Sequence, residues 1–378
     1  MNFTLSDDQQ AVREMARRYA AEKLLPGMQA REEAMAGQGQ MPGLERERGG
    51  LFEMGFGGML LPEDEGGLGL DHLSFSLALE EISRVDPSMG QLLSNHNAIG
   101  IGWMRHAAPR LRDNWLPRLA TGQALASWVR MDDIHQPLVA TLDPRGLRLN
   151  GVKRMVTAGA TGDVLLVSAL LDDKRVVLAL QAATEGVTQE WEPKSLGLRG
   201  AGIGRLVFRD VLVDEDARID SLLSGKALML LRATASLGWA SVALGIIEGA
   251  AHLSQAYAAQ REQFGRTIDR FEAVRFKLAD MLLKAEAARS LTWRAAAAAD
   301  AGQPTEYARL ADLARLAGAE GASFCGRECV QIHGGYGYSR EYHAERFMRD
   351  SRGMELVGGG VENLREAIAE RWIDGGSA

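Results

Sequence analysis

Two segments in the second half of the chain carry residue types suited to a phosphorylated ligand. Arg261 opens the sequence Arg-Glu-Gln-Phe-Gly (261–265), and a guanidinium pairs well with phosphate oxygens. The second segment reads Gln-Ile-His-Gly-Gly-Tyr-Gly-Tyr (331–338), and residues without a Cβ let backbone amides approach a ligand closely. Taken singly, Arg261 is typical of a solvated helix end, and Gly334 with Gly335 is typical of a helix C-cap.

The overall composition is that of a globular protein with an acidic balance. The 378 residues carry a formal net charge of -7, so nucleic acid is not an expected partner. The two cysteines, Cys325 and Cys329, belong to no cluster with metal-ligand spacing, which predicts a reduced, cytoplasmic protein without a metal. We expect no signal peptide in residues 1–6. The apolar stretch 233–247 is shorter than the roughly 20 residues that span a bilayer, so we expect a core helix and no membrane span.

Proline placement and apolar periodicity indicate long helices near the C-terminus. No proline occurs between Pro193 and Pro304, and none follows Pro304, so long helices are permitted there. Apolar residues at helical spacing predict helices over 226–260 and 271–301, and a third from 304 to about 331.

The middle of the chain has the composition of strands. Segments rich in Val and Leu, separated by turns such as Asp172-Asp173-Lys174, predict strands over 163–171, 175–181 and 205–213. We therefore expect an α+β protein, mostly α, in three parts. These are an N-terminal helical domain (1–122), a middle β-barrel or sandwich domain (123–216) and a C-terminal four-helix bundle (217–378).

Several segments in a fixed order resemble the acyl-CoA dehydrogenase family. Besides 261–265 and 331–338, they are Pro62–Gly69, Leu116–Gly122, Lys194–Gly200 and the Arg-Phe-Met-Arg-Asp sequence at 346–350. Each match alone is weak, but together, in the right order and spacing, they cover nearly the whole chain. The resemblance implies helical, β and helical domains, FAD as the cofactor and an acyl thioester as the substrate.

The resemblance also implies roles for individual residues, because the family binds FAD between subunits. Arg261 is expected to approach the FAD pyrophosphate of a neighbouring subunit, and Thr157 to bond the N5 edge of the flavin. The remaining expected contacts with the cofactor are apolar surface or closely approaching backbone: Gln263, Phe264, Ile268, Phe271, Gln331, His333, Gly334 and Gly335.

On the flavin-ring and substrate side, the chain departs from the family pattern. Gly358 stands where the family usually has the Glu that removes the substrate α-proton. Some relatives place that Glu near the position of Ala235 instead, and no carboxylate occurs there either. The loop 129–137 is shortened and altered, and Met155 replaces a Trp that lines the flavin. Thr157 is retained.

A dehydrogenase without this Glu needs another base, since a positioned base typically contributes ~10²–10⁴-fold. Weak candidates in the flanking segments are Glu355 and Glu362. In the altered loop the candidates are Asp132, Asp133 and His135. Each of the five is also typical of an ordinary surface carboxylate or loop histidine.

Four functions remain open at this point. The chain is an acyl-thioester dehydrogenase with a relocated base, or the base-lacking subunit of a heteromeric acyl-CoA dehydrogenase. Alternatively, it performs desulfinase-like chemistry on an acyl thioester, or it is a scaffold that binds no flavin. Expected partners are an acyl-CoA or other acyl thioester and an electron-transfer protein. The expected assembly is a homodimer, a homotetramer, or a heterotetramer with a Glu-bearing paralogue.

Overall fold

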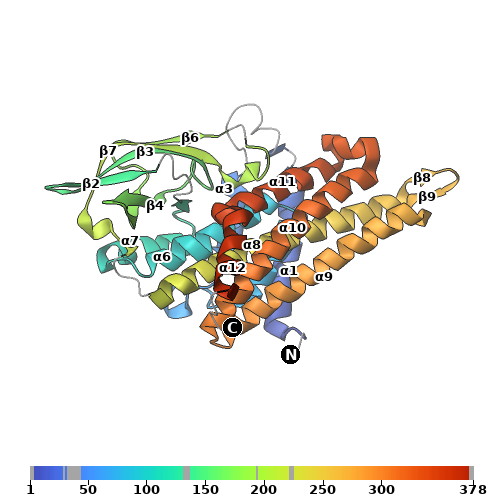
Figure 1. Ribbon diagram of the computed structural model, residues 1–378, viewed down its shortest axis with the longest axis horizontal. Helices are drawn as coiled ribbons and strands as arrows, with labels where there is room; N and C mark the ends of the chain where they lie inside the picture. The colour runs from blue at the N-terminus through green and yellow to red at the C-terminus, as the bar shows by residue number, and fades with distance from the viewer. Residues whose placement is uncertain are drawn as a thin grey trace.

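The protein is built from helices at both ends of the chain and a curled sheet between them (Figure 1). The computed structural model describes residues 4–28, 30–31, 44–130, 137–192, 195–220 and 225–373. This architecture confirms the expected α+β, mostly α class. The domain boundaries at residues 122 and 216 stay a prediction.

Three of the N-terminal helices begin at polar capping residues. In order, the N-terminal helices are α1 (Asp7–Tyr19), the π-helix η1 (Ala20–Leu24), α3 (Leu44–Glu53), α4 (His72–Ser83), α5 (Pro87–Ser94), the π-helix η4 (Asn95–Ile101), α6 (Gly102–Met104) and α7 (Pro109–Ala120). The three that begin at polar capping residues are α1, α4 and α5. Ser6 and Gln9 form a reciprocal capping box at the start of α1, and the Asp71 carboxylate caps α4 by accepting from Ser74 N–H at 2.6 Å. These caps satisfy backbone donors that a helix start leaves free.

The sheet contains seven strands. They are β1 (Ala126–Val129), β2 (Val139–Asp143), β3 (Gly146–Val156), β4 (Val164–Leu171), β5 (Lys174–Gln181), β6 (Val187–Trp191) and β7 (Gly204–Val213). Their order is β1-β4-β2-β3-β7-β6, with β5 pairing β4. Asp172 and Asp173 link β4 to β5 with φ values of 49° and 60°, as a tight two-residue hairpin turn requires. The predicted strands and this turn are therefore present.

Long helices form the C-terminal part. They are α8 (Gly225–Gln260), α9 (Glu272–Asp300), α10 (Pro304–His333), α11 (Ala344–Leu356) and α12 (Gly360–Ile373), with a small hairpin of β8 (Glu262–Gln263) and β9 (Arg266–Thr267) after α8. Helix α8 is long and apolar enough to cross a membrane by length and composition, but 78% of its most apolar window is buried inside the protein. Such burial is typical of a core helix.

His96 joins the N-terminal helices to the sheet. Its Nδ1 accepts a hydrogen bond from Ala126 N–H in β1 (3.2 Å), so the ring donates from Nε2 to the Leu119 carbonyl (3.0 Å). Burial lowers the His96 pKa to about 4, which keeps the ring neutral at physiological pH. This bond holds the start of β1, whose end carries a residue of the candidate site.

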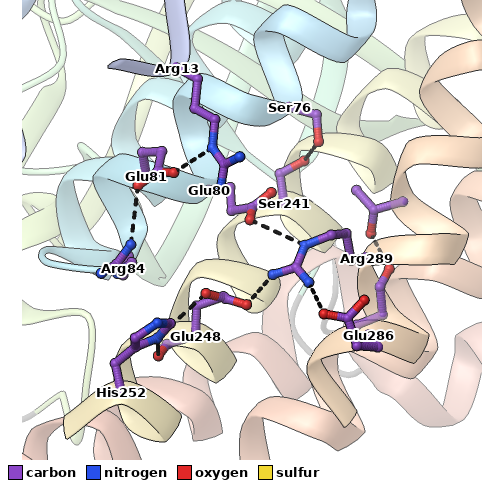
Figure 2. A network of polar contacts seen from close by, with 12 residues as sticks. Arg13, Ser76, Glu80, Glu81, Arg84, Ser241, Glu248, His252, Glu286 and Arg289 are labelled. Carbon is purple, nitrogen blue, oxygen red and sulfur yellow. Dashed lines mark hydrogen bonds and ion pairs between the residues drawn. The ribbon is translucent and has the colours of Figure 1, made fainter. Parts of the chain in front are cut away.

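A polar network crosses the interface between α4 and the long helices (Figure 2). Glu81 of α4 accepts from Arg13 of α1 at 2.7 Å, while neighbouring Glu80 lies 3.7 Å from Arg289 of α9. Arg289 also pairs with Glu248 of α8. Glu80 is 2% exposed, and burial raises its pKa to about 7 although Arg289 acts in the opposite direction.

The raised pKa of Glu80 predicts a pH-dependent stability. A folded-state pKa above the unfolded value stabilises the fold below about pH 4.5, and this contribution is lost as the pH rises towards 7. Gln mimics the protonated carboxyl. The free energy of unfolding of Glu80→Gln should therefore exceed that of the wild type by a margin that grows between pH 5 and pH 8, reaching on the order of 3 kcal/mol. Urea unfolding at several pH values measures the difference. Glu286→Gln, in the same network but 60% exposed, is the control. A pH-independent difference for Glu80→Gln would contradict the argument.

Candidate functional site

The turn between α11 and α12 can be formed only by residues that tolerate positive φ. Gly358, Gly359 and Gly360 have φ values of 63°, 93° and 86°, in the left-handed region that disfavours residues with a Cβ. The candidate base position therefore lies in a backbone conformation suited to glycine.

Three side chains occupy the space that a side chain at this turn would need. A Cβ on Gly358 would lie 2.3 Å from the Trp239 ring and 2.7 Å from Arg315 Nη2, and a Cβ on Gly359 would lie 2.4 Å from Arg130 Nη2. These neighbours come from α8, α10 and the segment after β1. Two guanidinium groups and an indole thus surround the turn.

The Trp239–Arg315 pair is fixed by contacts on several sides. The Arg315 guanidinium carbon lies 4.7 Å from the Trp239 ring centroid, and Nη2 donates to the Val357 carbonyl. The indole N–H of Trp239 donates to Asn95 Oδ1 at 2.9 Å. Trp239, Arg315 and Asn95 are all buried. Moving the Trp239 ring or the Arg315 guanidinium would therefore break hydrogen bonds that water cannot replace.

The candidate bases next to the turn are engaged in ion pairs. Glu355 accepts from Arg352 Nη1 at 2.9 Å, and Glu362 is 80% exposed and lies 3.4 Å from Arg365. Asp132, Asp133 and His135 lie outside the described residues. Ala235 is buried one turn before Trp239 on α8, so the alternative Glu position of some relatives also faces this part of the core. A catalytic role for any of the five candidates stays a prediction.

Thr157 and Met155, the two residues expected on the flavin side, lie at the end of β3 near β1. The Thr157 carbonyl accepts from Ser127 Oγ of β1 at 3.0 Å. Met155 has φ 56° and lies where the pairing of β3 with β7 shifts register between Lys153 and Val156. The segment that follows the irregular end of β3 therefore lies next to β1.

The predicted cofactor residues near 261–271 lie at an exposed end of the molecule. Figure 1 shows the β8–β9 hairpin at the tip of α8 and α9, away from the sheet. Phe264 forms the hairpin tip with φ 53° and is 94% exposed. Gln263 is exposed as well, whereas Ile268 is partly buried and Phe271 packs edge-on to Phe264 at 6.3 Å between centroids. The hairpin tip therefore presents the Phe264 ring to the outside.

The end of α10 supplies the second group of predicted residues. Its last residue, His333, is buried, and its Nδ1–H donates to the Cys329 carbonyl at 2.8 Å, while its Nε2 has no hydrogen-bond partner among the described residues. A Cβ added to Gly334 or Gly335 would meet nothing within 4 Å. Gln331 is exposed on the same helix end. Open space above two glycines leaves room for a ligand.

Aromatic rings connect this helix end to Arg261. Tyr257 of α8 stacks on His333 at 4.2 Å, and the Arg261 guanidinium lies 5.4 Å from the Tyr336 ring centroid. The structure therefore places Arg261 beside the turn that follows α10, close to the 331–335 segment. It places Thr157 elsewhere, at the sheet.

Sequence reasoning missed the side chains that fill the turn. Trp239 lies four residues after Ala235, on the same face of α8, so the helical spacing was available as a signal. Arg130 lies in the altered loop 129–137, but the sequence gives no sign that its guanidinium reaches the glycine turn. Arg315 is one of several arginines on α10, and nothing local in the sequence distinguishes it.

Comparisons with known proteins decide the family. The profiles described as "Acyl-CoA dehydrogenase, N-terminal domain" and "Acyl-CoA dehydrogenase, C-terminal domain" match residues 6–123 and 227–373. The short-chain specific acyl-CoA dehydrogenase of Clostridium acetobutylicum is 30% identical over 98% of this chain and 99% of its own length. The chain belongs to the acyl-CoA dehydrogenase family. Members of this family are flavoproteins that bind FAD.

Solved structures share the acyl-CoA dehydrogenase fold. Butyryl-CoA dehydrogenase from Megasphaera elsdenii superposes with a TM-score of 0.89 at 29% identity, covering 99% of this chain and 100% of that one. A chain from a structure of the electron transferring flavoprotein of Acidaminococcus fermentans, studied for flavin-based electron bifurcation, gives 0.89 at 30% identity, with coverage of 99% and 100%.

Stability measurements test whether the turn requires glycine for packing as well as for φ. Gly302 also has positive φ (67°), but a Cβ there would meet nothing within 4 Å, so Gly302→Ala should cost only about 1–2 kcal/mol of backbone strain. Gly358→Ala adds overlap with Trp239 and should cost about 2–5 kcal/mol. Chemical denaturation of both variants gives the comparison. Equal losses would show that Trp239 and Arg315 yield without cost.

Proposed function

We propose that this acyl-CoA dehydrogenase-family flavoprotein is the base-lacking subunit of a heteromeric acyl-CoA dehydrogenase. Its exposed end would complete the FAD site of a Glu-bearing paralogue. The observation that carries the proposal is that Trp239 and Arg315 fill the space beside Gly358, the base position, while Arg130 fills the space beside Gly359. A guanidinium stays protonated in proteins and cannot accept the substrate α-proton.

The residues of the exposed end fit the adenosine and pyrophosphate half of FAD. Arg261 offers a cation for phosphate oxygens, and Gly334 and Gly335 leave open space. In the described part of the chain, buried His333 Nε2 is without a hydrogen-bond partner. Phe264 presents apolar surface at the tip. When bound, FAD supplies the acceptor for the hydride that leaves the β-carbon of the acyl thioester. In this proposal the chain holds one end of the cofactor, and the paralogue supplies the base.

Assembly, electron transfer and location follow from the same proposal. We infer a heterotetramer or a related oligomer in which the α8–α9 end of this chain meets a neighbour. An acyl-CoA is the substrate of the assembly, and an electron-transfer protein takes up its electrons. The free, buried thiols of Cys325 and Cys329 suit a cytoplasmic location.

The dehydrogenase names of the relatives favour dehydrogenation over desulfinase-like chemistry or a scaffold. An autonomous dehydrogenase with a relocated base is the competing possibility. Its candidates are Glu355 and Glu362, together with Asp132, Asp133 and His135.

Activity of the purified chain separates these two functions. Alone, with FAD, butyryl-CoA and an artificial electron acceptor, the chain should show no turnover above background, while a Glu-bearing paralogue co-expressed with it should co-purify and restore activity. Turnover of the lone chain at about tens per second, in the ordinary enzyme range, would prove a base elsewhere and reject the proposal.

Arg261→Ala should lower FAD occupancy of the assembly. The change removes a charge-assisted contact with a phosphate, which is worth about 1.5–3 kcal/mol, or roughly ten- to a hundredfold in affinity. Flavin absorbance per protein after dialysis measures the loss. Arg270→Ala is the matched control, because Arg270 lies in the same segment with its side chain 74% exposed. An unchanged flavin ratio in Arg261→Ala would remove Arg261 from the site.

A further inference from the structure

The backbone of Arg261 is fixed, and its side chain extends from a rigid point. Arg261 N–H donates to the Tyr257 carbonyl at 2.9 Å, which completes the last turn of α8, and the Arg261 carbonyl accepts from Ile268 N–H at 2.8 Å. The orientation of the guanidinium therefore depends on contacts of the side chain alone.

The Arg261 guanidinium lies over an aromatic ring, that of Tyr336. Within the described part of the chain, no ion pair to Arg261 is recorded, and its guanidinium carbon lies 5.4 Å from the centroid of Tyr336. A carboxylate partner would neutralise the charge and compete with a phosphate. A ring face attracts the cation while leaving its N–H donors available to an anion.

Tyr336 is itself held in place by a second ring. It follows α10 in the 3-10 turn η9 (Gly334–Tyr338), and its ring centroid lies 5.1 Å from that of Tyr342. Tyr342 in turn packs edge-on against Tyr257 of α8, 5.8 Å away. The Tyr336 ring is thus anchored to α8, the helix from which Arg261 extends, although it remains 44% exposed.

We propose that Tyr336 is a positioning residue for Arg261: its ring holds the guanidinium in place to receive the pyrophosphate of FAD. This inference rests on the proposed function, since it takes Arg261 as a contact with the cofactor. An arginine side chain loses rotamer freedom when it binds. A ring that restricts the side chain beforehand lowers that cost and raises affinity without touching the ligand.

ADP and adenosine are suitable probes, because they separate the phosphates from the base. Titration calorimetry on the full chain would compare the wild type with Tyr336→Leu, Tyr336→Phe and Arg261→Ala. Tyr338→Leu is the matched control, because Tyr338 is two residues away, is 88% exposed and makes no ring contact with any described residue. Thermal unfolding of each variant confirms that the fold is intact.

Tyr336→Leu should weaken ADP binding roughly two- to tenfold, the range of a cation–π contact at a partly exposed site. Tyr336→Phe keeps the ring face and should bind ADP as the wild type does, as should Tyr338→Leu. In an Arg261→Ala background, Tyr336→Leu should have no further effect. Adenosine lacks the pyrophosphate, so its binding should be the same with and without Tyr336.

The possible contrary results are distinguishable. Weaker adenosine binding in Tyr336→Leu would show that the ring contacts the nucleotide itself and would overturn the positioning role. The same conclusion would follow if Tyr336→Leu weakened ADP binding as much in the Arg261→Ala background as in the wild type. If Arg261→Ala weakens ADP binding but Tyr336→Leu does not, this inference fails alone. If Arg261→Ala binds ADP as tightly as the wild type, or the wild type binds neither ADP nor FAD, the proposed function fails with it.

Discussion

The contact between the glycine turn and the Trp239–Arg315 pair is the constraint on which the functional site depends. The pair can reach Val357 only because Gly358 has no Cβ, and the turn can follow its path only because positive φ is open to glycine. A carboxylate base at this position and the present packing exclude each other. The packing around the turn therefore leaves no room for the side chain of a Glu at position 358.

The same constraint divides the molecule into two ends with different chemistry. Around the turn, the guanidinium groups of buried Arg315 and partly buried Arg130 lie beside the Trp239 indole. At the tip of α8 and α9, Arg261 and Phe264 are presented outwards, and Gly334 with Gly335 leaves open space. A chain organised in this way is suited to serving a site that another subunit completes.

Rigid connections between the two ends are supplied by α8 and its partners. The network of Glu80, Arg289 and Glu248 ties α4, α8 and α9 together, with Glu80 buried and the other two partly buried (Figure 2). Burying Glu80 is unfavourable for its charged form, so this tie favours a defined arrangement of helices more than it favours stability. The hairpin at the tip inherits its position from these helices.

Much of the architecture and of the exposed site was readable from the sequence, because its signals are local. Apolar periodicity and proline placement predicted the long helices, and Asp172-Asp173 predicted a hairpin. The motifs selected Arg261 and His333, which lie close together in the fold, and their roles toward the cofactor stay a prediction. The contents of the glycine turn were decided only by the tertiary structure. Trp239, Arg315 and Arg130 come from three separate elements, and no local pattern states that their side chains converge on one backbone turn. Convergence of this kind depends on how helices and a sheet pack, and packing brings together residues more than a hundred positions apart in the chain.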